Sequence, residues 1–235
     1  GYVFPPDLTK EELDAYIAAH PDDKDGLLSP FTVVRRDGDR LVAVPYHEVY
    51  AEFVLPAADL LDQAAALMDE RMRELEPGSP QAHNLAKQLA ADAYGRVPIV
   101  VGAGPLAPVA RRWKSQINEN SKGWSYFEVL PEMNHNAVSG IHFPPGLAER
   151  LCMLFLAGAA VHPRNRLRFE LTRQVFEGQG ILCRRIEAPG RTPLAQILTA
   201  IQLGDYVSVY LAALYGTDPT AIDDIVGLKR RMSGG

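Results

Sequence analysis

The chain has 235 residues, of which 47% are apolar and 23% charged, and its formal net charge is −5. This composition is typical of a soluble globular protein with room for one large domain or two small ones. The negative charge argues against a nucleic-acid partner, and the longest apolar run, residues 151–161, is too short for a membrane span of ~20 residues.

The first 50 residues carry few core-forming signals and are predicted to form an N-terminal appendage. Thr9 and Glu12 make a capping box, which predicts a short helix that ends near His20. Further on, Asp37-Gly38 separates two short apolar runs, and this pattern predicts a β-hairpin. None of these residues indicates a chemical role.

The rest of the chain alternates helical and strand patterns. Helices are predicted over residues 48–76, 80–94, 106–122, 167–179, 193–215 and 218–232. Strands are predicted over residues 97–101, 126–130, 152–156 and 180–186. The alternation predicts βαβ units and hence an α/β fold with a parallel sheet covered on both faces. We place an appendage and linker in residues 1–50 and one α/β domain in residues 51–235.

Capping residues predict where two of these helices begin. Ser79 is placed to cap the helix that starts at Pro80. Thr217 or Asp218 is placed to cap the last helix, with Pro219 in its first turn. Proline suits the first helical position because it lacks the N–H that would be unpaired there.

A glycine loop follows the first predicted strand of the domain. Gly102-Ala-Gly104-Pro-Leu-Ala107 resembles the G-x-G-x-x-A fingerprint of dinucleotide-binding folds, with Glu128 or Glu132 as the acid for the ribose. However, Pro105 has no N–H to donate to a pyrophosphate, and Glu128 falls inside a strand rather than at its end. A tight strand-to-helix turn that needs small residues is the better interpretation.

Glu119 and His135 form the strongest candidate for a catalytic pair. Glu119 lies near the C-terminal end of a predicted helix, where the dipole disfavours an anion, which suits a carboxylate that takes up and returns a proton. His135 sits in a polar turn and can act as an acid near neutral pH. Asn120 and Asn136 can donate hydrogen bonds without adding charge, and Glu132 is a rival for the base. The alternative is an asparagine-rich surface turn beside a solvated helix end.

Other side chains offer weaker signals. No spacing of histidines and cysteines fits a zinc site, and no P-loop or nucleophile elbow occurs, so we expect neither metal nor cofactor. Cys152 and Cys183 lie in apolar runs, which predicts free buried thiols in a reducing, cytoplasmic compartment. Asp205 and Ser208 share a helix face. Lys229 complements the dipole of the last helix, or else places a cation near a sugar oxygen.

Several segments together resemble the bifunctional phosphoglucose/phosphomannose isomerases of the sugar isomerase (SIS) superfamily. These segments are residues 112–114, 116–122, 130–136, 204–212 and 218–229, and the resemblance covers about residues 95–232. It implies a SIS-type, flavodoxin-like three-layer sandwich. It also implies aldose–ketose isomerisation of glucose 6-phosphate, mannose 6-phosphate or both to fructose 6-phosphate through a cis-enediol, without a metal or redox cofactor.

The resemblance also implies roles for individual residues. Glu119 occupies the place of the proton-shuttling base, His135 that of the histidine that helps to open the sugar ring, and Lys229 that of a lysine at the ring oxygen. Because the family supplies the histidine across a dimer interface, it implies a homodimer with shared active sites. Substrate binding is assigned to their polar neighbours Asn120, Asn136 and Glu132.

The family's first SIS half, with its Ser/Thr/Gly-rich phosphate loop, has no counterpart in this sequence. We therefore expect a C-terminal half or a divergent form, active only when joined to a phosphate-binding half. Two other hypotheses stay open. One is a non-catalytic SIS module that binds sugar phosphates or mediates association. The other is a nicotinamide-dependent enzyme, which depends on Gly102 and Gly104 alone.

Overall fold

The computed structural model describes residues 11, 15, 18, 32–37 and 40–233. The chain divides into two compact units, residues 1–60 and 61–235, which are described separately. Apart from three helical positions, the helix predicted between Thr9 and His20 lies outside the described residues.

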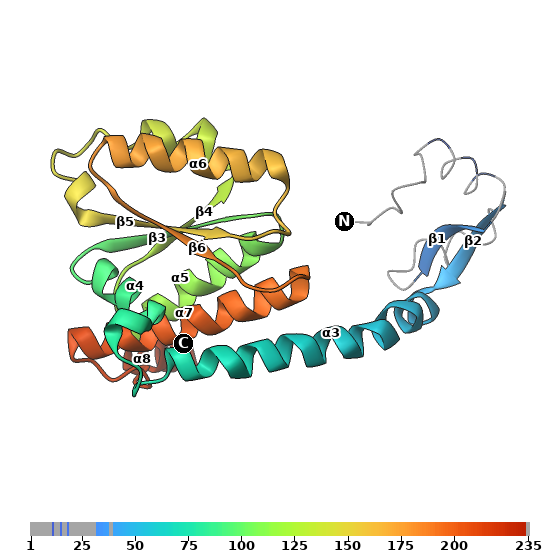
Figure 1. Cartoon of the computed structure of the whole chain (residues 1–235), viewed down its shortest axis with the longest axis horizontal. Helices are drawn as coiled ribbons and strands as arrows, with labels where there is room; N and C mark the ends of the chain where they lie inside the picture. Colours follow the sequence, from blue (N-terminus) through green and yellow to red (C-terminus); the bar gives the residue numbers. More distant parts are fainter. Residues whose placement is uncertain (1–10, 12–14, 16–17, 19–31, 38–39, 234–235) are drawn as a thin grey trace. The chain divides into compact units, whose positions relative to one another are not determined.

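The first unit contains an antiparallel hairpin of two strands, β1 (Thr32–Asp37) and β2 (Arg40–Pro45) (Figure 1). Asp37 pairs with Arg40, so the chain reverses over the two residues between them. This pairing confirms the hairpin predicted around Asp37-Gly38, although Gly38 itself lies outside the described residues.

The second unit is an α/β sandwich built on a four-stranded parallel sheet in the order β4-β3-β5-β6. Its strands are β3 (Val97–Ala103), β4 (Tyr126–Leu130), β5 (Leu151–Ala157) and β6 (Leu182–Glu187). Its helices are α4 (Leu85–Ala93), α5 (Ala107–Ser121), α6 (Pro163–Gly178), α7 (Pro193–Tyr215), α8 (Asp223–Ser233) and the end of α3 (Tyr46–Leu75). The predicted fold class is confirmed.

The helices form a layer on each face of the sheet (Figure 1). Helix α6 covers one face, and α4, α5 and α7 lie on the other. All seven residues of the central strand β5 are buried, because a parallel sheet with helices on both sides has no solvent-facing side. Both cysteines are free, as predicted: Cys152 is buried in β5 and Cys183 is half-buried in β6.

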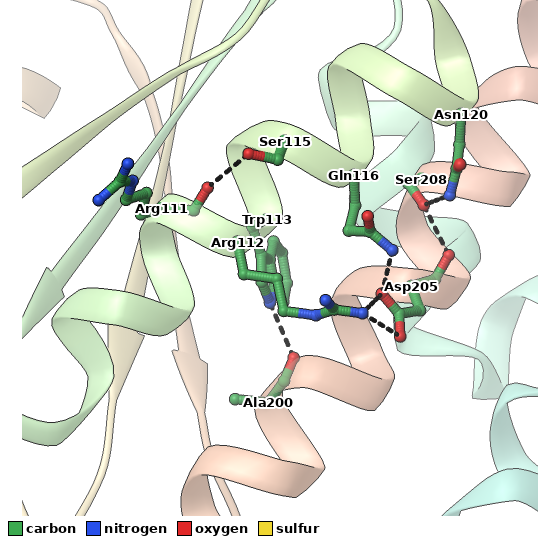
Figure 2. A network of polar contacts seen from close by, with 9 residues as sticks. All are labelled: Arg111, Arg112, Trp113, Ser115, Gln116, Asn120, Ala200, Asp205 and Ser208. Atoms are coloured by element: carbon green, nitrogen blue, oxygen red, sulfur yellow. Dashed lines mark hydrogen bonds and ion pairs between the residues drawn. The ribbon is translucent and has the colours of Figure 1, made fainter. Parts of the chain in front are cut away.

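Helix α7 packs against both α4 and α5. Among the described helices, it is the one whose length and apolar composition would also suit a membrane span, but 44% of its most apolar window is buried inside the unit. Its contact with α5 is unusually close: Trp113 donates from Nε1 to the carbonyl of Ala200 at 2.8 Å (Figure 2). A Cβ on Gly204 would lie 2.3 Å from that nitrogen, so only glycine fits there.

Three predicted helix starts are wrong. Residues after Pro80 form a 3-10 turn, η2 (Gln81–His83), and α4 begins later, where the Asn84 side chain accepts from the N–H of Lys87 at 3.1 Å. Ser79 therefore caps no helix. The segment around Ser79 and Pro80 is a local turn, which proline and a short polar residue can form as readily as a helix start.

The last helix also starts later than predicted. Asp218 accepts from the N–H of Thr220 at 2.8 Å and from its hydroxyl at 2.7 Å, which closes a separate turn, and α8 begins only at Asp223. Helix α6, by contrast, starts before the predicted residue 167, because His162 Nδ1 accepts from the N–H of Arg164 and caps it.

Candidate active site

The six predicted site residues fall at two opposite edges of the parallel sheet. Helix α5 leaves the carboxyl end of β3 and returns to the amino edge, so Glu119 in its last turn lies near the start of β4. His135 follows the carboxyl end of β4. Strand β4 has five residues, or ~17 Å at about 3.3 Å per residue. Glu119 and His135 of one chain therefore cannot contact the same carbon atoms of a sugar.

Glu119 is exposed at the C-terminal end of α5. None of the hydrogen bonds and ion pairs of the described residues involves its carboxylate. Its backbone carbonyl, in contrast, accepts from Lys122 Nζ at 2.6 Å. The backbone of Glu119 is thus held while the carboxylate stays available to a ligand.

Asn120 belongs to a network between α5 and α7 (Figure 2). Its Nδ2 donates to Ser208 Oγ at 2.8 Å, and that hydroxyl donates to the Asp205 carbonyl at 2.7 Å. The Asp205 carboxylate accepts from Gln116 Nε2 at 2.8 Å and from Arg112 Nη2 at 3.4 Å. The amide of Asn120, predicted to bind substrate, therefore donates within the protein and fixes the helix end that carries the candidate base.

A second asparagine supports the same helix end from the other side. Asn118 Oδ1 accepts from the N–H of Ser125 at 3.0 Å and from its hydroxyl at 2.7 Å, and Ser125 is fully buried. The sequence indicated that Asp205 and Ser208 share a helix face. It gave no signal that Arg112 and Gln116 would contact Asp205. Those contacts join residues about 90 positions apart.

The carboxyl edge carries the other candidates in η4 (Glu132–His135). Met133 is fully buried and anchors the turn, while Glu132 and His135 are exposed. Asn136 donates to Glu132 Oε1 at 3.1 Å. Asn134 donates to Thr172 Oγ1 at 2.7 Å, which joins the turn to α6. The structure therefore brings Glu132, His135 and Asn136 together in one exposed, well-anchored turn.

The turn affects the carboxyl of Glu128, which lies in the preceding strand β4. Burial raises the pKa of its carboxyl, and the negative charge of Glu132 raises it further. From the sequence, Glu128 was considered only as a ligand for a ribose. In the structure it adds a proton-accepting group beside this turn.

Lys229 lies exposed on α8, which follows α7 after the turn at Gly216. Because α7 starts after the carboxyl end of β6, it ends at the amino edge, the edge of Glu119. Lys122 Nζ lies 3.4 Å from the carbonyl of Pro219 in the connection to α8. The element with Glu119 and the segment that leads to Lys229 are therefore neighbours, whereas the turn with His135 is remote from both.

The glycine loop is a packing feature. A Cβ on Gly102 would lie 2.4 Å from the carbonyl oxygen of Leu106, so the strand-to-helix turn requires glycine. The crevice where such sheets bind dinucleotides opens at the carboxyl ends of their strands. At this end of the sheet the buried Gln196 joins the segments that follow β5 and β6: its Oε1 accepts from the Ala160 N–H at 3.0 Å and its Nε2 donates to the Gly190 carbonyl at 2.8 Å. The glycine at position 102 is thus explained by the packing of the turn itself.

Within the described part of the chain, no group of three or more His, Cys, Asp or Glu side chains is arranged to hold a metal ion. The site that remains consists of two exposed surfaces of acid, amide and imidazole groups. The side chains on these two surfaces can act as general acids and bases.

Comparison with known proteins places this architecture. Residues 82–232 match the model of the bacterial phospho-glucose isomerase C-terminal SIS domain. Curated relatives include the bifunctional phosphoglucose/phosphomannose isomerases of Caldicellulosiruptor bescii, 34% identical over 76% of this chain and 53% of that protein, and of Aquifex aeolicus, 35% identical over 74% and 52%. The chain thus spans about half the length of these relatives.

Among solved structures, a glucose-6-phosphate isomerase-like protein from Thermus thermophilus aligns with a TM-score of 0.61. At 22% identity, over 69% of this chain and 54% of that one, it supports the fold only. The family model alone covers more than half of the chain and includes Glu119, His135 and Lys229. The chain belongs to the family of the bacterial phosphoglucose isomerase C-terminal SIS domain.

Proposed function

We propose that this chain is the catalytic C-terminal half of a sugar-phosphate isomerase that converts glucose 6-phosphate, mannose 6-phosphate or both to fructose 6-phosphate. The observation that carries the proposal is Glu119: an exposed carboxylate without a described partner, on a helix end fixed by Asn118 and Asn120. A general base needs this combination of an available carboxylate and a fixed backbone.

The reaction that we assign moves one proton between adjacent carbons. After ring opening, the Glu119 carboxylate takes the proton from C2 of the aldose while the carbonyl oxygen at C1 gains a proton, which gives a cis-enediol. Glu119 then returns its proton to C1 as the hydroxyl at C2 loses one, which gives the ketose. The cation of Lys229 stabilises negative charge on the sugar oxygens during these steps.

His135 has the separate role of protonating the ring oxygen as the ring opens, which suits an imidazole at neutral pH. Because His135 lies at the opposite sheet edge from Glu119, we propose that each active site takes Glu119 from one chain and His135 from a second copy. Glu132 and Asn136 would enter with that histidine as substrate contacts, since all three lie in one turn.

Turnover in the protein at its natural length tests this proposal. Glu119→Gln keeps the size of the side chain and removes the base, so we expect kcat to fall ~10²–10⁴-fold with the fold intact. Glu149→Gln is the matched control, because Glu149 is another exposed glutamate that we assign no role, and its activity should be unchanged. Full activity of Glu119→Gln would exclude it as the base. Sugar-phosphate binding by calorimetry without turnover in the wild type would favour a non-catalytic module.

Mixed dimers test the shared site. Glu119→Gln and His135→Ala should each be nearly inactive alone. After co-expression, half of the dimers are mixed, and each of these has one intact site, so about a quarter of wild-type activity should return. If verified mixed dimers showed no recovery, either both residues would act in a site formed by one chain or one of them would not belong to the site.

A further inference from the structure

Lys122 has a backbone conformation that normally belongs to glycine. It follows the last residue of α5 with φ 57° and ψ 7°, in the left-handed region. Among the described residues other than glycine, no other has a positive φ. The matching position at the end of α7 is Gly216, and Gly95 has a similar φ after α4. A lysine here accepts a steric cost that glycine would avoid, so its side chain must contribute something in return.

That contribution lies in three backbone carbonyls around its ammonium group. Lys122 Nζ donates to the Glu119 carbonyl at 2.6 Å, to the Asn120 carbonyl at 3.3 Å and to the Pro219 carbonyl at 3.4 Å. The first two are unpaired carbonyls at the C-terminal end of α5, where a cation is favoured by the helix dipole. The third belongs to the connection between α7 and α8. One ammonium therefore contacts the backbone of the candidate base and the segment that leads to Lys229.

The chain directly after Lys122 is held against α7. Gly123 donates its N–H to Ser121 Oγ at 3.2 Å, and a Cβ on Gly123 would lie 3.5 Å from the ring of Tyr215 at the end of α7. Helix α8 itself has no buried residue. Because α8 buries no residue of its own, the contact between Lys122 Nζ and the Pro219 carbonyl is one of the few described contacts that hold the connection from which α8 starts.

We propose that Lys122 is a positioning residue for the isomerase site, which rests on the proposed function above. It does not take part in proton transfer. It fixes the distance between the Glu119 backbone and the start of the segment with Lys229, so that carboxylate and ammonium reach the same substrate. Small misplacements of a catalytic group cost rate, so loss of this cation should lower kcat about tenfold or more. KM should stay within about twofold, because the role that we propose for Lys122 involves no contact with the substrate.

Two substitutions separate positioning from simple stabilisation. Lys122→Gly removes the ammonium and relieves the backbone, so the protein should melt at the wild-type temperature or above it while kcat falls. Lys122→Arg keeps a long cation and should retain most of the rate. If Lys122 had only a structural role, the folded Lys122→Gly variant would keep the wild-type kcat.

The matched control is Lys87→Met. Lys87 Nζ also donates to two backbone carbonyls, those of Pro77 at 2.8 Å and Ser79 at 2.7 Å, and neither carbonyl belongs to α5 or to the connection between α7 and α8. This variant should keep the wild-type kcat. All variants are measured in the protein at its natural length, with glucose 6-phosphate as the probe.

The outcomes distinguish the two proposals. A wild-type protein that binds but does not turn over the sugar phosphate overturns both. Wild-type turnover with an equal kcat for Lys122→Gly overturns the positioning role and leaves the isomerase intact.

Discussion

The contact between Trp113 and Gly204 gives the sharpest prediction about stability. A Cβ added at Gly204 would lie 2.3 Å from Trp113 Nε1 and 2.5 Å from Cδ1 and Cε2. Ordinary contact needs about 3.5 Å, so the indole must move by roughly 1 Å. Trp113 is only 1% exposed, and its environment is closely packed, so this movement has no free space to use.

Two costs add up in Gly204→Ala. Overpacking a core costs ~1–3 kcal/mol. Shifting the indole also breaks its 2.8 Å bond to the Ala200 carbonyl and leaves a buried N–H unpaired, which costs ~1–3 kcal/mol. Alanine regains ~0.5–1 kcal/mol by its better helix propensity. The free energy of unfolding should therefore fall by roughly 1–5 kcal/mol, and Tm by about 2–20 °C.

Urea unfolding followed by circular dichroism measures this loss. Gly227→Ala in α8 is the control, because nothing lies within 4 Å of its added Cβ, and it should cause no loss. Trp113→Ala removes the atoms that the Cβ meets, so Gly204→Ala should cost at least ~1 kcal/mol less in that background. A loss below about 1 kcal/mol, or an equal loss in both backgrounds, would refute the steric argument.

Three further predictions concern other parts of the second unit. Since burial raises the pKa of Glu128 when folded, the folded state binds more protons than the unfolded chain just above the ordinary glutamate pKa. Its stability therefore falls as pH rises through that window, and Glu128→Gln should flatten this dependence in urea titrations at several pH values. Burial raises the pKa values of Cys152 and Cys183 to about 12, so both thiols should react with a thiol reagent at pH 8 at least ~100-fold more slowly than in denaturant. Gly102→Ala would place a Cβ 2.4 Å from the backbone oxygen of Leu106 and should lower the free energy of unfolding by ~2 kcal/mol or more, against no loss for Gly178→Ala.

Each of these predictions has a result that would contradict it. For Glu128, an unchanged pH dependence in the glutamine variant would show that this carboxyl is not the one that titrates. Rapid modification of both thiols in the folded chain would contradict their burial. Wild-type stability of Gly102→Ala would mean that the strand-to-helix turn can widen.

The sequence predicted those elements best whose patterns are long and unambiguous. The 23 residues of α7 and the five of β4 have the predicted bounds, because apolar periodicity runs to both ends of each. The helix starts near Ser79 and Asp218 were wrong, because a proline with a neighbouring polar residue is an equally good turn signal. Whether such a segment forms a helix start or a turn depends on tertiary packing, which a local sequence pattern does not contain.

The candidate site shows the same division. Glu119 and His135 could be selected from residue types and their place in a polar stretch. That they lie at opposite edges follows from topology, since strand β4 separates them. The pairing of Asn120 with Ser208 spans 88 positions and could not be predicted, because side-chain contacts between distant helices depend on their packing register. The amide of Asn120, predicted to bind substrate, thus donates within the protein beside Glu119.

The buried bond between Trp113 and Ala200 also determines when this domain can fold during its synthesis. Its partners are 87 positions apart. At about 5–20 residues per second, the ribosome makes the indole roughly 4–17 s before its acceptor. During that delay the inner faces of α4 and α5 have no α7 to cover them, and they are open to chaperones and proteases. The nascent chain therefore depends on its last long helix, and a premature stop before residue 193 would leave a sheet without one of its layers complete.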